Sequence, residues 1–334
     1  MSNNITENEK LSDILTRPEL KEHKREINFV EDSDGMQFGD MSLHRIAKMV
    51  GTWNAESMAE GLRYLSERSK MEDIFFDLWT ETDIIKDISK ENTTLMAFTV
   101  KKKSKFVLIC AGGGYASVAS IVEGFPIAKR INELGYTAFV LKYRTGKDAL
   151  TPNPMDDIAQ AVRFIQENSD RFNIDIEDYA VAGFSAGGHL AASFGLEHIG
   201  YRHYGLPKPG AMILAYPVIT MADKTHSDSR KNLLGEKNVH NQKQINRYSI
   251  ELNITSSFPP SFVWQCNKDN IVPIENTQML VKGLKEKGVP CVYEVFQSNA
   301  HGWGMGKGTE AEGWVDRAID FWKDSFKSAL EKDI

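Results

Sequence analysis

The sequence has little of several features that would each mark a class of protein. Its 334 residues include three cysteines, Cys110, Cys266 and Cys291, each in or beside an apolar segment. An odd number of cysteines in such positions predicts reduced, packed thiols rather than a disulfide framework. The sequence also lacks an apolar run long enough to cross a bilayer. We therefore expect no membrane partner.

Targeting signals and excess positive charge are missing as well. The N-terminal stretch MSNNITENEKLSDILTRPELKEHKRE is polar and lacks the basic and apolar regions of a secretory signal. This absence predicts a cytoplasmic location. The chain has 40 basic and 46 acidic residues and a net charge of -6, so it has no excess of positive charge to attract the phosphates of a nucleic acid. We expect no nucleic-acid partner.

Motifs for metals and nucleotides are absent too. The sequence contains no H-E-x-x-H, no paired C-x-x-C and no G-x-x-x-x-G-K-[ST]. These patterns would supply metal ligands or a phosphate-binding loop. We expect no metal and no cofactor.

From residue 105 onward, short apolar runs alternate with longer amphipathic stretches. This alternation is typical of an α/β fold with a mostly parallel central sheet flanked by helices. The predicted strands are 106–110, 137–143, 179–184, 211–216, 261–266 and 291–296. The predicted helices are about 121–133, 154–169, 186–196, 274–287 and 310–330. The polar stretch 221–250 is the best candidate for an insertion over the sheet.

The chain before residue 105 differs. Segments 95–100 and 74–79 resemble early strands, which we expect to be antiparallel at the edge of the same sheet. Residues 1–70 have apolar positions at helical spacing, with Asp40 and Asn54 as candidate N-caps. The apolar positions are Ile46, Met49, Val50, Met58, Leu62 and Leu65.

The candidate nucleophile is Ser185. It lies in GFSAGG, which follows the apolar strand YAVAGF and precedes the Ala-rich run HLAASFGL. The G-x-S-x-G pattern therefore occurs in the strand-turn-helix setting that exposes a serine on a sharp turn. A tight structural turn is the alternative interpretation.

A serine hydroxyl needs a base to accept its proton and a third group to orient that base. In hydrolases with a serine on such a turn, the acid and then the histidine follow on loops after late strands. Asp269 stands just beyond the strand SFVWQC, and His301 just beyond CVYEVF, where Gly302 permits a tight loop. We predict Asp269 as the acid and His301 as the base.

Other residues are alternative candidates for the roles of acid and base. Asp223 and Asp228 are alternative acids if the strand register differs, and Asp269 is alternatively a turn or capping residue. His189 falls on the helix after the nucleophile, where a packed or exposed histidine is expected. His226 and His240 lie in the polar insertion.

Acyl transfer also requires donors for the oxyanion of the tetrahedral intermediate. The amide of Ala186, directly after the nucleophile, is one candidate. The run Gly112-Gly113-Gly114, directly after strand 106–110, is the other, because glycine lets backbone amides approach a substrate closely.

With these motifs in order, the sequence resembles the acetylesterase and acetyl-xylan-esterase-like branch of the α/β hydrolases, which is related to the prolyl oligopeptidase class. The resemblance runs from about residue 105 to 325, roughly two thirds of the chain. The segments that carry it are AGGGYAS, VEGFPIA, AFVLKYR, PMDDIAQAVRFI, GFSAGGHLAAS, AYPVIT, SRKNLLGE, FPPSFVWQCNKDNIVPIENT and NAHGW. Upstream, TWNAESMAEGL resembles the helical N-terminal extension of some bacterial members.

The resemblance implies an α/β-hydrolase fold and a set of site residues. It assigns Ser185, Asp269 and His301 to a catalytic triad. It further implies that the amides of Gly113, Gly114 and Ala186 form the oxyanion hole and that Tyr115 lines the acyl pocket. Ala111 replaces the histidine of the H-G-G-G form, so a hormone-sensitive-lipase type is disfavoured.

The expected organisation is a helical extension, residues 1–70, followed by a catalytic domain, residues 71–334. The extension is a cap over the site, a dimer contact in a homo-oligomer or simply a packed segment. The expected activity is hydrolysis of short-chain acetyl esters, with a carbohydrate such as an acetylated xylo-oligosaccharide as a candidate small-molecule substrate. The alternatives are a peptidase of the prolyl-oligopeptidase-like class and a non-catalytic ligand-binding protein of the same fold.

Overall fold

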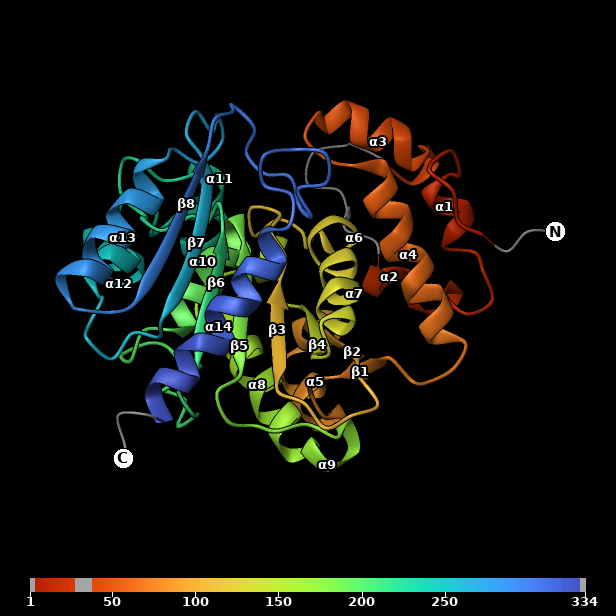
Figure 1. Cartoon of the computed structure of the whole chain (residues 1–334), viewed down its shortest axis with the longest axis horizontal. Helices are drawn as coiled ribbons and strands as arrows, with labels where there is room; N and C mark the ends of the chain where they lie inside the picture. The colour runs from red at the N-terminus through yellow and green to blue at the C-terminus, as the bar shows by residue number, and fades with distance from the viewer. Residues whose placement is uncertain (1–3, 28–37, 331–334) are drawn as a thin grey trace.

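One twisted sheet between two layers of helices forms the centre of the molecule (Figure 1). The computed structural model describes residues 4–27 and 38–330, without the side chains of 326–330. The eight strands lie in the order β1-β2-β4-β3-β5-β6-β7-β8. They are β1 (Phe75–Asp77), β2 (Thr94–Phe98), β3 (Phe106–Cys110), β4 (Thr137–Lys142), β5 (Ala180–Phe184), β6 (Ala211–Ala215), β7 (Ser261–Cys266) and β8 (Cys291–Phe296).

The sheet is parallel from β4 to β8 and antiparallel at the β1 edge. β1 pairs with β2 and β2 with β4 in antiparallel register, for example Met96 opposite Val140. All pairs from β4 to β8 are parallel, for example Ala182 opposite Ile213. The predicted strands and the predicted antiparallel edge are therefore confirmed, with ends that differ by a few residues.

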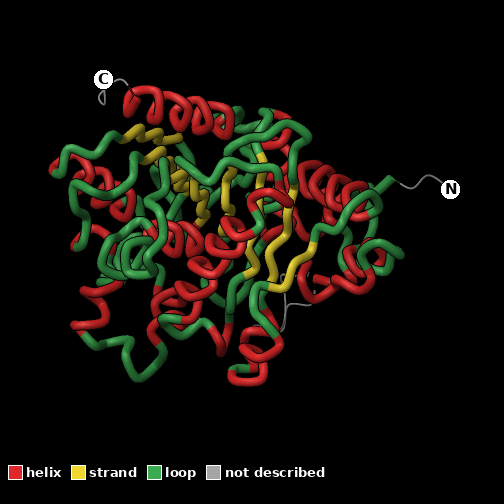
Figure 2. The backbone as a smooth tube through the Cα atoms, turned by 90° about the horizontal axis from the view of Figure 1, so that it is seen from below, coloured by secondary structure: helices red, strands yellow, loops and turns green. Residues whose placement is uncertain are grey.

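Helices cover both faces of the sheet because its central strands are apolar on both sides. On one face lie α7 (Phe125–Glu133) and α14 (Trp314–Leu330), and on the other α8 (Asn153–Glu167), α10 (Ser185–Phe194) and α13 (Glu275–Glu286). In Figure 2 the strands form a row between these layers, and their direction turns from one edge to the other. The resulting arrangement is the predicted α/β layer structure.

The remaining helices precede or connect these elements. They are α1 (Leu11–Ile14), α2 (Lys24–Ile27), α3 (Leu43–Val50), α4 (Ala55–Ser69), α5 (Glu81–Lys86), α6 (Ser120–Glu123), α9 (Ser169–Phe172), α11 (Ser227–Leu234) and α12 (Gln242–Tyr248). Single 3-10 turns span Lys21–His23, Phe38–Asp40, Ile88–Asn92, Gly146–Asp148 and Ile250–Leu252. The polar segment 221–250 thus carries α11 and α12 between β6 and β7.

The N-terminal helices pack against the α7 face of the sheet. Met58, Leu62 and Leu65 of α4 are fully buried in the same apolar cluster as α7 and α14. The close approach of α4 and α7 requires Gly61, because a Cβ there would lie 2.7 Å from the Pro126 ring. The predicted boundary near residue 70 falls between the end of α4 and the start of β1.

Two details of this region differ from the sequence predictions. The N-cap of α4 is Asn54, as predicted, and its side chain accepts a hydrogen bond from the Ser57 amide at 2.8 Å. The N-cap of α3 is Ser42 rather than Asp40, because Asp40 belongs to the preceding 3-10 turn. Met49 and Val50 are exposed rather than packed, since they lie at the C-terminal end of α3 away from the sheet.

The three cysteines are free thiols, as predicted. Cys110 and Cys266 are buried at the ends of β3 and β7, and burial raises the pKa of the Cys266 thiol to about 12. Within residues 4–27 and 38–330, none of the helices combines the length and apolar character that a bilayer crossing requires.

Candidate active site

Ser185 lies at the turn between β5 and α10, at the carboxyl end of a central strand. Its φ is +50°, a conformation that a residue with a side chain adopts only where the surroundings enforce it. Gly187 allows the start of α10 to lie directly against the end of β3, because a Cβ there would lie 2.2 Å from the Cys110 carbonyl oxygen. Ser185 is 7% exposed and lines a cavity.

His301 and Asp269 meet Ser185 at this turn. The Ser185 Oγ lies 2.8 Å from His301 Nε2, and His301 Nδ1 lies 2.9 Å from Asp269 Oδ2. A carboxylate only accepts hydrogen bonds, so Nδ1 carries the hydrogen and Nε2 is free to accept one from the serine hydroxyl. The loops after β7 and β8 thus bring a carboxylate and an imidazole to the Ser185 hydroxyl in the predicted chain order.

Asp269 is oriented by further donors. Its Oδ1 accepts hydrogen bonds from the amides of Ile271 and Val272, both at 2.9 Å. Its Oδ2 accepts one from Gln265 Nε2 at 3.0 Å, and Gln265 is held in turn by the Thr277 hydroxyl at 2.8 Å. These contacts leave the carboxylate one orientation, with Oδ2 toward His301.

The alternative acids lie elsewhere. Asp223 follows β6, and Asp228 lies in the first turn of α11, and both are exposed to solvent. Asp269, by contrast, is buried beside His301. The geometry therefore favours Asp269 over both.

The glycine run after β3 lies across the cavity from His301. Gly113 and Gly114 both line the cavity and have positive φ values of 129° and 64°. Ala186 is in the first turn of α10, where amides have no acceptor within the helix. Gly113 and Gly114 thus line the cavity beside Ser185, and Ala186 directly follows it, while the Gly112 amide is engaged by Glu123.

Glu123 is a buried acidic residue that the sequence prediction missed. Its Oε2 accepts a hydrogen bond from the Gly112 amide at 2.6 Å, and its Oε1 accepts one from the Tyr216 hydroxyl at 2.8 Å. Burial raises the pKa of this carboxyl, while the two donors and nearby His301 lower it. Glu123 also contributes to the cavity lining, so it lies directly behind the glycine run.

Tyr216 connects Glu123 to the loop that carries His301. Its hydroxyl accepts a hydrogen bond from the Gly304 amide at 3.3 Å, and its ring lies 5.2 Å from the His301 ring, centroid to centroid. Gly302 packs flat on this ring, since a Cβ there would lie 2.4 Å from it. Glu123 and Tyr216 thus join the glycine run to the histidine loop.

The cavity beside Ser185 has a volume of about 460 Å³, within the range of small-molecule sites. Its lining comprises residues 50–53, Gly113, Gly114, Ser117, Ala119, Glu123, Ser185, His226, Asn270, Ile271, Asn299, Ala300, His301 and Gly302. His226 is the contribution of the polar insertion. It caps α11 through Ser229, and burial lowers its pKa.

Tyr115 differs from its predicted place in the acyl pocket. Its φ of +60° turns the side chain into the core, where it is 1% exposed and absent from the cavity lining. The Tyr115 hydroxyl lies 2.8 Å from Nδ1 of His189, which is fully buried on α10. The structure therefore gives Tyr115 a packing position beneath the nucleophile helix, and His189 is a packed histidine, as expected.

Across the described ranges, no three His, Cys, Asp or Glu side chains cluster closely enough to hold a metal ion. The acidic and histidine side chains of the site are instead engaged with protein donors and acceptors.

The central sheet, the serine turn and the two loops together define an α/β hydrolase, and comparison with known proteins agrees. The family model BD-FAE matches residues 95–284, more than half of the chain. The chain belongs to the BD-FAE family. The solved structure of an acetyl ester-xyloside bifunctional hydrolase from Caldicellulosiruptor lactoaceticus is similar at a TM-score of 0.65 and 29% identity, over 76% of this chain and 96% of that one. The predicted α/β-hydrolase fold is confirmed.

Two curated relatives have related names. The chain is 34% identical to Endo-1,4-beta-xylanase B of Butyrivibrio fibrisolvens over 64% of its own length and 34% of that protein. It is 31% identical to an acetylxylan esterase of Xylanibacter ruminicola over 58% of its length and 40% of that protein. The chain thus spans well under half of each of these two relatives. The predicted resemblance to the acetyl-xylan-esterase-like branch is confirmed, and the second name, together with the acetyl ester hydrolase structure, supports the class of carboxylic ester hydrolases.

Proposed function

We propose that this protein hydrolyses short-chain carboxylic esters, acetyl esters above all, with Ser185 as nucleophile, His301 as base and Asp269 as the acid that orients it. The observation that carries the proposal is the hydrogen-bonded series from Ser185 through His301 to Asp269, with contacts of 2.8 and 2.9 Å, beside a cavity of about 460 Å³.

The reaction proceeds in two steps. His301 Nε2 takes the proton of Ser185 as Oγ attacks the ester carbonyl, and the oxyanion is stabilised by the amides of Gly113, Gly114 and Ala186. The intermediate collapses to an acyl-enzyme, and His301 gives its proton to the departing alcohol. Water, deprotonated by the same histidine, then attacks the acyl-enzyme, and the carboxylic acid leaves as Ser185 regains its proton.

The proposed substrate is an acetylated carbohydrate. An acetyl group fills a small part of the cavity, which leaves room for an alcohol portion the size of a sugar. The cavity lining includes hydroxyl, amide and imidazole side chains, Ser117, Asn270, Asn299 and His226, which suit a polar alcohol. The names of the xylanase and acetylxylan esterase relatives support the same choice.

The test is hydrolysis of p-nitrophenyl esters of increasing acyl length, with an acetylated xylo-oligosaccharide as competitor and a p-nitroanilide as the amide control. We expect the acetate ester to be cleaved fastest, the oligosaccharide to compete, and the anilide to be cleaved far more slowly. The Ser185→Ala protein is expected to lose this activity while keeping its melting temperature.

Each part of the proposal can fail separately. No cleavage of any ester would refute the esterase function, and preference for long acyl chains would refute the acetyl specificity. Faster cleavage of the anilide than of the esters would favour a peptidase. Full activity in Ser185→Ala would refute the nucleophile.

A further inference from the structure

The last residue of α3 and the loop from α3 to α4 form one wall of the active-site cavity. These residues, Val50, Gly51, Thr52 and Trp53, line the same cavity as Ser185 and His301. The BD-FAE match starts at residue 95, so this wall lies outside the family region. In Figure 1, α3 lies at the same end of the molecule as the loop after β8. The N-terminal helices are therefore placed to contact whatever occupies the cavity.

The α3–α4 segment contributes two apolar side chains, Val50 and Trp53, to a lining that also includes polar side chains. Val50 is 37% exposed. Trp53 is half-buried and packs on the apolar cluster beneath it while it also lines the cavity. The amide and hydroxyl side chains of Asn270, Asn299 and Ser117 line the same cavity. A cavity that offers both an apolar ring and polar groups suits a sugar ring, which has apolar faces and a polar rim.

The wall is fixed relative to the loop that carries His301. Trp53 immediately precedes Asn54, the cap of α4. On the next turns of α4, Glu56 and Glu60 form ion pairs with Lys307 at 2.8 and 3.3 Å. Lys307 lies in the loop after His301, and the contact with Glu56 raises its pKa. The wall and the histidine loop are thus held together.

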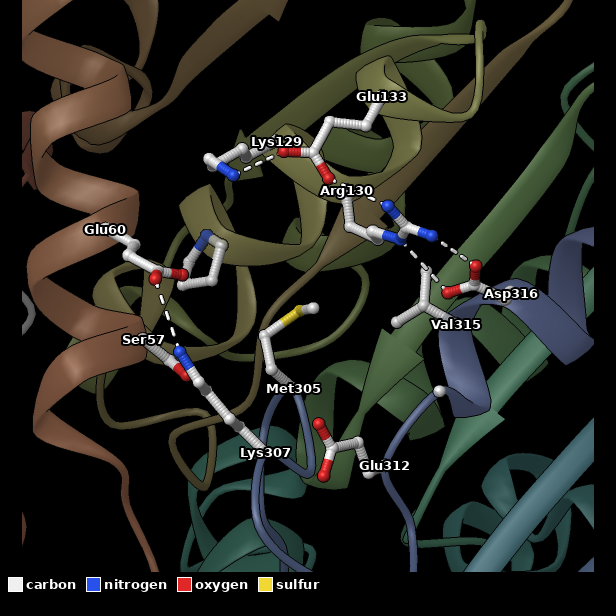
Figure 3. A pocket seen from close by; sticks show the side chains of 12 residues that line it. Ser57, Glu60, Lys129, Arg130, Glu133, Met305, Lys307, Glu312, Val315 and Asp316 are labelled. Atoms are coloured by element: carbon white, nitrogen blue, oxygen red, sulfur yellow. Dashed lines mark hydrogen bonds and ion pairs between the residues drawn. The ribbon is translucent and has the colours of Figure 1, made fainter.

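Figure 3 shows this junction from a neighbouring cavity of about 490 Å³, where Lys307 and Met305 face Ser57 and Glu60 of α4. The other charged groups there are also paired, Lys129 and Arg130 with Glu133, and Arg130 with Asp316. The charges in this cavity are thus largely neutralised by one another. We therefore assign the neighbouring cavity a role in joining α4 to the histidine loop rather than in binding.

We propose that residues 50–53, with Trp53 as the main contact, form the subsite for the alcohol portion of the substrate and select a sugar ring there. This inference rests on the proposed esterase function and deepens it. The acetyl group must sit between Ser185 and the glycine run, so the remaining lining, including the α3–α4 loop, is left for the alcohol. Trp53 is a specificity-determining residue and takes no part in bond breaking.

The test compares two acetates that share the acyl group, ethyl acetate and acetylated xylobiose, in wild type, Trp53→Ala and Trp53→Phe. We expect Trp53→Ala to lower the ratio of kcat/KM for acetylated xylobiose over that for ethyl acetate by about tenfold, mostly through KM. Trp53→Phe retains an aromatic face and is expected to restore most of the ratio.

Trp79→Phe is the matched control, since Trp79 is a half-buried tryptophan near Asp157 on the β1 side of the molecule. Its ratio is expected to equal that of wild type, and thermal melts of all variants establish that they are folded. An unchanged ratio in Trp53→Ala would overturn the subsite, as would a wild type that cleaves ethyl acetate but not acetylated xylobiose. A wild type inactive on both acetates would refute the proposed function itself.

Discussion

Two histidines near the nucleophile have similar partners and very different surroundings. His301 faces a serine hydroxyl through Nε2 and the Asp269 carboxylate through Nδ1. His189 faces the Tyr115 hydroxyl through Nδ1 and the Tyr248 carbonyl oxygen through Nε2, at 2.7 Å. A carbonyl only accepts, so His189 carries its hydrogen on Nε2 and accepts from the tyrosine. Each histidine is thus fixed in one tautomer with a hydroxyl as donor.

The difference lies in the charge of the second partner and in access to solvent. The Asp269 carboxylate lies 2.9 Å from His301 Nδ1, and His301 lines the cavity beside Ser185. His189 has only a neutral carbonyl and is fully buried, so its pKa is lowered to about 4 by desolvation. A histidine that is hydrogen-bonded to a hydroxyl is therefore a candidate base only where a carboxylate is also present and substrate can reach the ring.

The difference between the two histidines is tested most directly by replacing each of them with alanine. His301→Ala is expected to lower kcat on an acetate ester by about 10⁵-fold with little change in melting temperature. His189→Ala is expected to destabilise the fold by about 2–4 kcal/mol, because it leaves a cavity and two unpaired buried groups. Steady-state kinetics and denaturant melts measure both. If His189→Ala abolished turnover in the folded protein, the two pairs would not be distinct in function.

The second prediction concerns the Asp269 carboxylate. Asp269→Asn is expected to lower kcat by about 10⁴-fold, because an amide neither fixes the His301 tautomer nor stabilises the imidazolium. Asp228→Asn is the matched control, since Asp228 is exposed on α11. The same assay on both proteins decides between the two acids. A large loss in Asp228→Asn, with Asp269→Asn active, would reverse the assignment.

Acid unfolding tests the burial of His189. The unfolded chain protonates this residue near its ordinary pKa of 6.5, the folded chain only near 4. The stability contributed by the neutral ring is therefore complete above pH 6.5 and is lost as the pH falls toward 4, by up to roughly 3 kcal/mol. The free energy of unfolding of wild type should thus fall more steeply over this range than that of His189→Gln. Parallel pH profiles would show that His189 is not held neutral.

The link between Glu123 and Tyr216 predicts a smaller effect. Glu123→Ala removes the acceptor for the Gly112 amide and frees the glycine run, so kcat is expected to fall by about 10²-fold. Glu123→Gln keeps an acceptor and is expected to recover most activity. Tyr216→Phe removes the contact to Gly304 and is expected to cost about tenfold. Additive losses in the Glu123→Ala, Tyr216→Phe double variant would argue against a shared network.

The sequence predicted those parts of the molecule that depend on local pattern. The central strands β3, β5 and β7 are short apolar runs buried on both faces, so their positions follow from the local apolar pattern. Ser185, Asp269 and His301 were predicted as site residues from a turn motif and from chain order, and the structure brings these three side chains together.

The residues that were missed depend on packing between distant segments. Glu123 is the last residue of the short helix α6, and nothing local indicates that it is buried against the residues that follow β3 and β6. Trp53 occurs in the segment TWNAESMAEGL, but nothing local indicates that it lines the cavity, since its position there depends on the packing of α4 on α7. Tyr115 was placed in the pocket by resemblance, while a single positive φ turns its side chain into the core.

The α3–α4 loop has a consequence for how such a chain diversifies. The residues proposed to contact the alcohol portion of the substrate lie in one short stretch, residues 50–53. Ser185, Asp269 and His301, by contrast, lie where strands of the sheet end. Exchange of that stretch between homologues can therefore alter which alcohols are accepted while the bond-breaking apparatus is inherited unchanged.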